Sequence, residues 1–402
     1  MTGRRGAWVA VGLLWVVVLL NYLDRQVIFS LFPLLRADLR LSDAELGLVS
    51  SSFLWVYALA SPLAGYLSDR LGHRRLVLFS LVVWSLVTAL TGLARSFGEL
   101  VLARAAMGLS EACYIPAALA LIASRHSEAT RARAVGIHQS GIYFGIVLGG
   151  MGGGWMGEHY GWRPVFYLLG AAGVVYGLLL TRLLKRGEQE ETAARESFVA
   201  AAAELLRTPG FKIVLLVFAV TSLANWLVYT WLPLFLYERF SLSLTSAGFA
   251  STFYVQVMAV VGILAGGWIS DRWTRRQPRA RVWVQAAGLA IAGPFLILSG
   301  MASTPVLLYM ALVAFGFGRG VYDSNIMPVL CRLVGDDRRA TGYGLLNFAG
   351  VMVGGLAAYG AGLVKSTVGL AGAMQMAGAL VLLCAGVLLA TPQPAAVESH
   401  GG

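Results

Sequence analysis

Charged residues are scarce in this sequence: they make up only 13% of 402 positions, whereas hydrophobic residues make up 58%. A soluble protein of this size needs far more polar surface to face water, so the composition excludes a soluble globular fold. The three cysteines, Cys113, Cys331 and Cys384, lie far apart and within apolar stretches. They form neither a disulfide framework nor a set of metal ligands.

The sequence also lacks a phosphate-binding loop, a nucleophile elbow and a cluster of metal ligands. We therefore expect neither an enzyme nor an ATP-driven pump, and no cofactor. A cleavable signal peptide is missing too, because the first apolar run exceeds the length of a signal core and has no small-residue cleavage site. This run is interpreted as the first permanent membrane span.

Apolar runs of 18 residues or more are abundant, and this is the length that crosses a bilayer as a helix. They predict an all-α membrane protein with twelve transmembrane helices. The predicted spans are 8–35, 46–68, 76–95, 98–123, 134–157, 163–184, 211–239, 246–271, 282–302, 304–332, 340–364 and 369–391.

The net charge of +11 is placed in a way that indicates membrane topology rather than nucleic-acid binding. Basic clusters alternate with poorly charged loops along the chain. If the amino terminus is inside, most of the 31 Lys and Arg fall in cytoplasmic segments, as the positive-inside rule requires. The sequence therefore predicts a protein of the cell membrane with both termini in the cytoplasm.

The two halves of the chain repeat one another. Residues 65–70 resemble residues 267–272, and Pro33 corresponds to Pro233 at nearly the same offset. The longest polar stretch divides the spans into six plus six. We predict an amino-terminal six-helix bundle at 1–184, a cytoplasmic linker with a surface helix at 185–210, and a carboxy-terminal bundle at 211–402. Repeats of this kind place a substrate site between the halves, near the membrane midplane.

Residues 65–75 resemble the signature loop between helices 2 and 3 of the major facilitator superfamily, at the glycines, the Asp and the basic residues. The copy at 267–272 is weaker. The resemblance covers the whole chain and implies the major facilitator fold, with transport by alternating access. It assigns conformational switching to Gly65, Asp69, Arg70, Gly72, Arg74, Arg75, Arg104, Asp271 and Arg272.

Residues 21–25 and 108–116 resemble two branches of this superfamily. One is the anion–cation symporter group, which carries sugar acids, although Cys113 stands where that group usually has proline. The other is the Spinster group of lysolipid and sphingolipid carriers. The resemblance implies proton-coupled symport of a small organic anion. The alternatives are Spinster-like proton-dependent lysophospholipid or sphingolipid transport and proton-driven efflux. The expected partners are a small organic anion or lysolipid and the bilayer, with no nucleic acid and a monomer as the default.

Asp24 and Arg25 interrupt the first predicted span near its middle. An ionisable side chain at that depth costs roughly 2.5–3.5 kcal/mol on insertion scales, so we expect it to face a water-filled cavity and to have a function. Glu111 is a second carboxylate on a helix that neighbours the first in this architecture. We assign proton coupling to Asp24 and Glu111. Arg25 is the candidate partner of the substrate anion, because a guanidinium binds a carboxylate bidentately. The alternative is a structural ion pair of Asp24 or Glu111 with Arg25 or Arg104.

Other polar residues within the spans are candidate substrate contacts. Arg319 and Asp323 are four residues apart and share a helix face, so they either compensate each other or contact substrate. The candidate contacts besides Arg25 are Asn21, Tyr22, Tyr114, His138, Gln139, Tyr229, Arg319, Tyr322, Asp323, Asn325 and Asn347.

Overall fold

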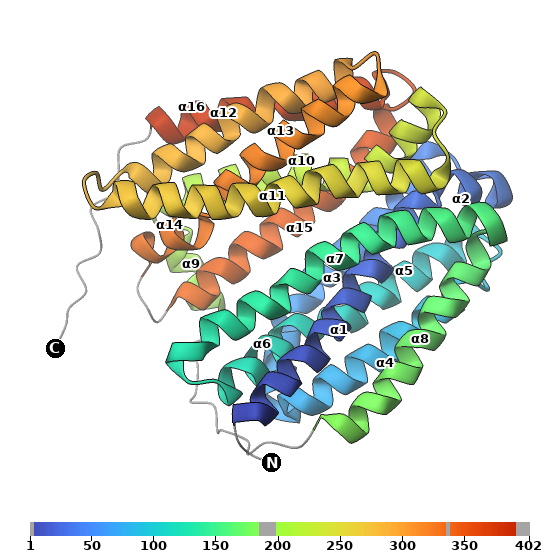
Figure 1. Ribbon diagram of the computed structural model, residues 1–402, viewed down its shortest axis with the longest axis horizontal. Coiled ribbons are helices and arrows are strands. Elements are labelled where there is room, and N and C mark those ends of the chain that lie inside the picture. Colours follow the sequence, from blue (N-terminus) through green and yellow to red (C-terminus); the bar gives the residue numbers. More distant parts are fainter. Residues whose placement is uncertain (1–3, 185–197, 335–337, 391–402) are drawn as a thin grey trace. The chain divides into compact units, whose positions relative to one another are not determined.

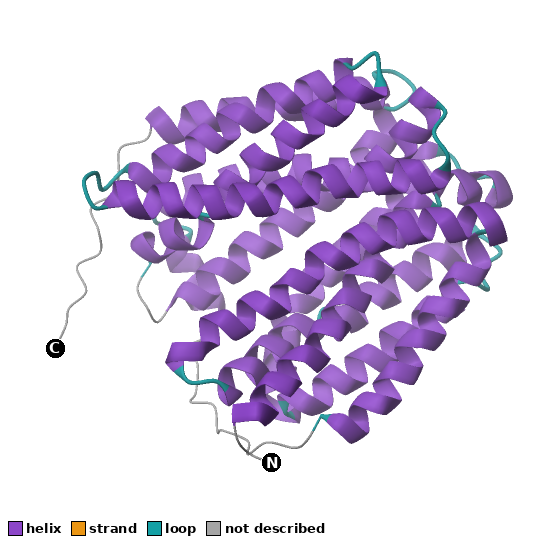
Figure 2. Ribbon diagram, viewed as in Figure 1, coloured by secondary structure: helices purple, strands orange, loops and turns teal. Residues whose placement is uncertain are grey.

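The structure, a computed structural model, describes residues 4–184, 198–334 and 338–390. These residues form sixteen helices and no strand (Figures 1 and 2). The helices are α1 (Arg4–Ser30), α2 (Phe32–Leu39), α3 (Asp43–Leu71), α4 (His73–Thr91), α5 (Phe97–Glu111), α6 (Tyr114–Arg125), α7 (Glu128–Tyr160), α8 (Trp162–Leu183), α9 (Phe198–Leu205), α10 (Pro209–Phe240), α11 (Leu244–Thr274), α12 (Ala280–Met301), α13 (Pro305–Asp323), α14 (Ile326–Leu333), α15 (Arg339–Val364) and α16 (Gly369–Ala390).

Eleven stretches of the described chain are long and apolar enough to cross a membrane. The helix α7 is 33 residues long, but its many glycines, together with His138 and Gln139, lower its hydropathy. With α7 as the twelfth span, the helices match the predicted order. The prediction of an all-α membrane protein is confirmed.

Three of the predicted spans are broken into two helices each. The first breaks at Leu31, and Pro33 lies in the first turn of the next helix. The other two breaks separate α5 from α6 and α13 from α14, and Pro116 and Pro328 are each the third residue after the break. Proline has no backbone N–H, so it fits best in the first turn of a helix. Each of the three breaks is followed by a helix with a proline in its first turn, whereas Pro62, Pro233 and Pro294 lie inside unbroken helices.

The chain divides into two compact units, and each is described here by itself. Unit 1 comprises Met1–Ala193 and Tyr229–Thr252, and unit 2 comprises Ala194–Val228 and Phe253–Gly402. The predicted linker begins in residues 185–197, which lie outside the described residues. Its second part contains the short helix α9.

Within unit 1, α1 lies along α7, α3 along α5 and α4 along α8 (Figure 1). Glycines on α7 let the first pair approach closely. A Cβ on Gly145 would lie 2.5 Å from the carbonyl oxygen of Leu19, and a Cβ on Gly149 would lie 2.7 Å from that of Leu23. The glycine stripe is thus a backbone-to-backbone contact, as small residues at membrane-helix interfaces allow.

Unit 1 also includes the end of α10 and the start of α11. The ring of Trp231 lies 5.6 Å from that of Phe32, edge to face. Arg36 on α2 donates to Glu238 on α10 at 2.6 Å. Gly150 on α7 packs so closely on α11 that a Cβ would lie 2.5 Å from the carbonyl oxygen of Gly248. Aromatic, ionic and backbone contacts therefore hold the segment 229–252 in this unit.

Within unit 2, α12 lies along α13 and α16. A Cβ on Gly288 would lie 2.6 Å from the carbonyl oxygen of Gly318, so this pair also approaches through glycine. A second apolar cluster joins α10, α14 and α15 through Phe211, Leu330 and Leu346, all fully buried. Backbone proximity through glycine is therefore used in both units.

Replacing Gly145 by Ala should destabilise the protein, because the new methyl group would meet the backbone of α1, which cannot move aside without moving the helix. We expect the free energy of unfolding to fall by about 1–3 kcal/mol, measured by thermal unfolding in detergent. Gly152→Ala is the matched control on the same helix, since a Cβ there meets nothing within 4 Å. Equal stability of the two variants would contradict the close packing of α1 on α7.

Candidate functional site

Arg25 on α1 and Glu111 at the end of α5 form a buried ion pair. The Nε atom of Arg25 lies 2.5 Å from Oε2 of Glu111, and the exposed fractions of the two residues are 7% and 0%. The guanidinium carbon lies 4.8, 5.1 and 4.5 Å from the ring centres of Tyr22, Phe53 and Tyr57. The cation is thus held by one carboxylate and three aromatic faces, which attract it electrostatically.

Arg104 and Asp24 extend this pair into a cluster of four buried charges. The guanidinium carbon of Arg104 lies 4.7 Å from the ring of Phe53, the same ring that Arg25 contacts. Arg104 also interacts electrostatically with Asp24 and Glu111. Thr88 on α4 donates to Oδ2 of Asp24 at 3.4 Å. The cluster contains two cations and two carboxylates, so its formal charges sum to zero.

Close packing of α5 on α3 brings these groups together. A Cβ on Gly108 would lie 2.5 Å from the carbonyl oxygen of Phe53 and 3.1 Å from the amide of Tyr57. Only glycine allows this approach, and it places Glu111, one helical turn later, at the level of the two aromatic rings. The helix then ends at Glu111.

Tyr114 and His138 form a second buried polar group in unit 1. The hydroxyl of Tyr114 lies 2.8 Å from the carbonyl oxygen of Leu14 and 2.9 Å from Nε2 of His138. A carbonyl only accepts, so the single hydroxyl proton goes to Leu14 and Nε2 of His138 must donate to Tyr114. The imidazole therefore carries a proton on Nε2. Gln139, the next residue, is half-buried.

The remaining candidate contacts fall into both units. Tyr229 belongs to unit 1. In unit 2, Nε of Arg319 lies 3.3 Å from Oδ2 of Asp323, one turn later on α13. Tyr322 and Asn325 are buried beside this pair in the chain. Asn347 lies half-buried on α15. The structure thus gathers Asn21, Tyr22, Asp24, Arg25 and Glu111 in unit 1, and Arg319 and Asp323 in unit 2.

Glu111 and Asp323 occupy equivalent positions in the two halves. Each is the last residue of its helix, and each lies five residues before the proline of the following helix. A glycine precedes each carboxylate by three residues: Gly108 packs on α3, and Gly320 packs on α11, where a Cβ would lie 2.1 Å from a carbonyl oxygen. The two halves therefore build the same helix break around a buried carboxylate.

The partners of these two carboxylates differ. Glu111 pairs with an arginine from a different helix, whereas Asp323 pairs with Arg319 on its own helix. An ion pair within one helix keeps its distance when helices shift. A pair between α1 and α5 changes when those helices move. The amino-terminal pair is therefore the one suited to respond to movement.

The residues assigned to conformational switching lie mainly at two helix connections. Gly72, with φ 85°, separates α3 from α4 in a conformation that suits glycine. Arg74 donates to the carbonyl oxygens of Thr181 and Leu184 at the end of α8. Asp271 accepts from Arg281 at 2.9 Å. The side chain of Asp69 lies outside the described residues, as does the environment of Gly65. Of the remaining members, Arg70, Arg75 and Arg272 are exposed, whereas Arg104 lies in the buried charge cluster.

Sequence reasoning missed Phe53 and Tyr57, which contact the Arg25 guanidinium, and Thr88, which binds Asp24. The two aromatic residues are four apart and share a helix face. Nothing in their pattern distinguishes them from ordinary core residues, and Thr88 is one hydroxyl in an apolar span. Only the folded structure assigns them to the site.

The twelve-span fold and the buried, charge-balanced cluster define a multi-pass membrane transporter. A family model described as "Major Facilitator Superfamily" matches residues 14–359. This chain belongs to the Major Facilitator Superfamily. The predicted resemblance and fold are confirmed, and so is the prediction that the chain is not an enzyme.

The relatives of this chain include transporters of several kinds. An "MFS-type efflux pump" of Mycolicibacterium smegmatis is 30% identical over 395 residues, covering 96% of this chain and 91% of that protein. A D-galactonate transporter of Escherichia coli O6:H1 is 27% identical over 384 residues, covering 88% and 87%. A probable galactarate/D-glucarate transporter of Escherichia coli K12 is 26% identical over 365 residues, covering 80% and 79%.

A solved structure of a bacterial homolog of the human lysosomal transporter Spinster, in an inward-facing and occupied conformation, has the same fold. Its TM-score is 0.82 at 22% sequence identity, and the match covers 94% of this chain and 95% of that one. At this identity the likeness supports the fold alone.

Replacing one member of the Arg25–Glu111 pair should destabilise the protein more than replacing both members. Glu111→Gln leaves a buried guanidinium without its carboxylate, so we expect a loss of about 3–5 kcal/mol in the free energy of unfolding. The double variant Arg25→Gln/Glu111→Gln removes both charges and should be more stable than Glu111→Gln alone. Thermal unfolding in detergent of the wild type, Arg25→Gln, Glu111→Gln and the double variant measures this coupling, and strictly additive losses would show that the two side chains do not interact.

Proposed function

We propose that this transporter moves a small organic anion of sugar-acid size together with a proton. The observation that carries the proposal is the state of the Arg25 guanidinium. Its Nε is taken by Glu111, but its Nη2 is buried without a hydrogen-bond partner. A buried donor left unpaired costs about 1–3 kcal/mol, and an anion with a carboxylate would supply the missing acceptor.

Charge balance supports coupling to protons. Asp24, Glu111, Arg25 and Arg104 sum to zero, and an uncompensated charge in a buried site costs several kcal/mol. One monovalent anion bound alone would leave the cluster at −1. One anion bound with one proton returns it to zero. The site is therefore expected to load the two together, which is the requirement for symport.

Glu111 is the proposed place for this proton. When Glu111 is ionised it holds Arg25 itself and competes with a substrate carboxylate for the same guanidinium. When Glu111 is protonated its attraction for Arg25 weakens, and the guanidinium can turn to the substrate. Asp24 is the proposed second proton-binding group, within reach of Thr88 and of the field of Arg104. Transport in this scheme follows alternating access, with both termini in the cytoplasm and a monomer as the working unit.

A second candidate function is proton-driven efflux. The observation that favours it is the Mycolicibacterium smegmatis efflux pump, which is similar to this chain over nearly the full length of both proteins. The same cluster would serve that function if the proton and the substrate bound alternately instead of together. Proton binding at Glu111 would then displace the substrate. The direction of proton movement separates the two.

The test is uptake into proteoliposomes that contain a pH-sensitive dye. We expect external D-galactonate, galactarate, D-glucarate or a hexuronate to acidify the lumen. Arg25→Gln should lower this rate at least tenfold, since a charged hydrogen bond is worth about 1.5–3 kcal/mol. The matched control is Arg131→Gln, an exposed arginine on α7 that should keep the wild-type rate. Luminal alkalinisation on solute entry would favour the antiporter, and wild-type rates in Arg25→Gln would remove Arg25 from the mechanism.

Glu111→Gln should separate substrate movement from proton movement, because the amide cannot take up or release the proton. We expect this variant to retain exchange of labelled anion across the membrane while losing accumulation driven by a pH gradient. Asp24→Asn is the parallel variant for the second carboxylate. If Glu111→Gln still accumulates anion against its gradient at the wild-type level, the coupling proton is carried elsewhere.

A further inference from the structure

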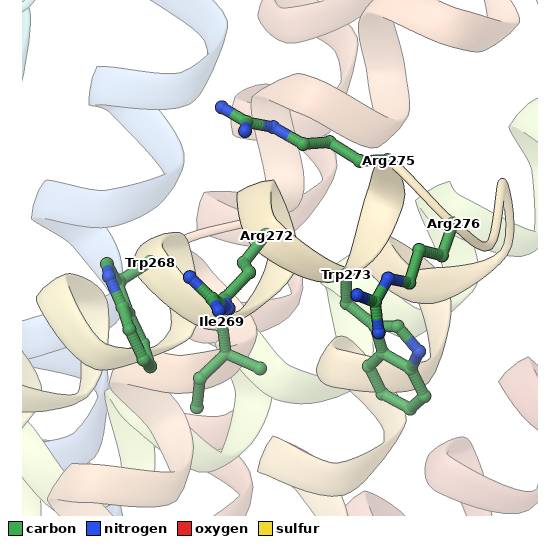
Figure 3. A pocket seen from close by; sticks show the side chains of 6 residues that line it. All are labelled: Trp268, Ile269, Arg272, Trp273, Arg275 and Arg276. Carbon is green, nitrogen blue, oxygen red and sulfur yellow. The ribbon is translucent and has the colours of Figure 1, made fainter.

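A concentration of positive charge lies in unit 2, far along the chain from the neutral buried cluster. A cavity of about 420 Å³ adjoins the end of α11 (Figure 3). A volume of this size is typical of sites for small molecules. The lining residues are Trp268, Ile269, Arg272, Trp273, Arg275 and Arg276.

Four of these residues lie on the last two turns of α11, and Arg275 and Arg276 lie in the turn that follows the helix. Trp268 and Arg272 are four residues apart, which places them on one helix face. Figure 3 shows the side chain of Arg272 beside Trp268 and that of Arg276 beside Trp273, whereas Arg275 extends in another direction. The cavity therefore combines aromatic surface with three guanidinium groups.

The charge of these three arginines is not compensated within the described part of the chain. All three are exposed, and their guanidinium groups make no hydrogen bond or ion pair with a described residue. Their neighbours differ in this respect, because Arg281 binds Asp271 and Arg332 binds the carbonyl oxygen of Pro278. Among the described residues, no acidic side chain lines the cavity. An anion would thus meet three available cations.

We propose that this cavity binds the headgroup of an anionic phospholipid. Guanidinium groups pair with phosphate through parallel hydrogen bonds. Basic pockets at the ends of membrane helices bind anionic headgroups, and tryptophan favours the interface between lipid and water. Val261 and Leu264 of the same membrane span are exposed and lie seven and four residues before Trp268, so they share its helix face and offer an apolar surface for acyl chains. A free anion would gain nothing from that apolar surface.

The repeated sequence in the first half provides an internal contrast. Residues 65–70 match residues 267–272, but Leu71 stands at the position equivalent to Trp273, and Arg74 stands at the position equivalent to Arg276. Arg74 is bound to carbonyl oxygens of α8 and is not available in the same way. The lipid site is therefore a feature of the second half only, beyond any role of the repeated loop in switching.

The experiment is native mass spectrometry of the whole protein in a neutral detergent, titrated with phosphatidylglycerol and with phosphatidylcholine of the same acyl chains. We expect phosphatidylglycerol to bind at about tenfold lower concentration or less, because each basic residue adds attraction to an anionic headgroup. The triple variant Arg272→Gln/Arg275→Gln/Arg276→Gln should lose this preference. The control triple Arg131→Gln/Arg182→Gln/Arg207→Gln changes the net charge equally and should keep it, since all three positions are exposed and lie on other segments.

A second arm separates a lipid site from a site for free phosphate. Inorganic phosphate and glycerol 3-phosphate are added as competitors of bound phosphatidylglycerol, and we expect neither to displace it at equal concentration. Equal competition by inorganic phosphate would overturn the lipid assignment. Loss of preference in the control triple, or equal binding of the two lipids by the wild type, would overturn the proposed site. Thermal unfolding of each variant verifies that it remains folded.

Discussion

The ion pair of Arg25 and Glu111 is the interaction on which the rest of unit 1 depends. Either charge alone would be costly inside a membrane span, so neither helix is stable there unless the other lies beside it. At a separation of 2.5 Å the pair fixes the register of α1 against α5. The three aromatic rings around Arg25 exclude water from the pair without supplying a competing charge. The resulting cluster is neutral, buried and open to perturbation by one added charge.

Glycine makes this arrangement sterically feasible. The backbones of α3 and α5 meet at Gly108, and those of α1 and α7 meet at Gly145 and Gly149. Helices that contact through backbone surfaces have few interlocked side chains to hinder small displacements. The ion pair of Arg25 and Glu111 thus joins two helices, α1 and α5, that each pack closely on a neighbouring helix through glycine. The pair of Arg319 and Asp323 stays within one helix. Duplication preserved the helix break around the carboxylate, and the two halves diverged in what the carboxylate binds.

Much of the fold could be predicted from the sequence because its causes are local. The lengths of the apolar runs set the number of spans, and the repeated landmarks near Gly65 and Gly267 revealed the duplication. The three breaks were not predicted. A proline such as Pro116 is compatible with a new helix that begins two or three residues before it, so the sequence shows where a helix could begin again. Tertiary packing decides whether the span breaks there. The low hydropathy of α7 likewise has a tertiary cause, because its glycines are needed for close contact with α1.

The sequence by itself determined which side chains in the site are costly and therefore significant: Asp24, Arg25, Arg104 and Glu111 stand out because charge is rare in apolar spans. It left open which of them pair, and the structure decided for Arg25 with Glu111. It gave no sign of the aromatic rings of Phe53 and Tyr57 around the guanidinium. The physical reason is that a residue type and its apolar surroundings suffice to show that a charge is costly. Which side chain pairs with that charge depends on the distance between them, and only the tertiary arrangement of α1, α3 and α5 sets that distance.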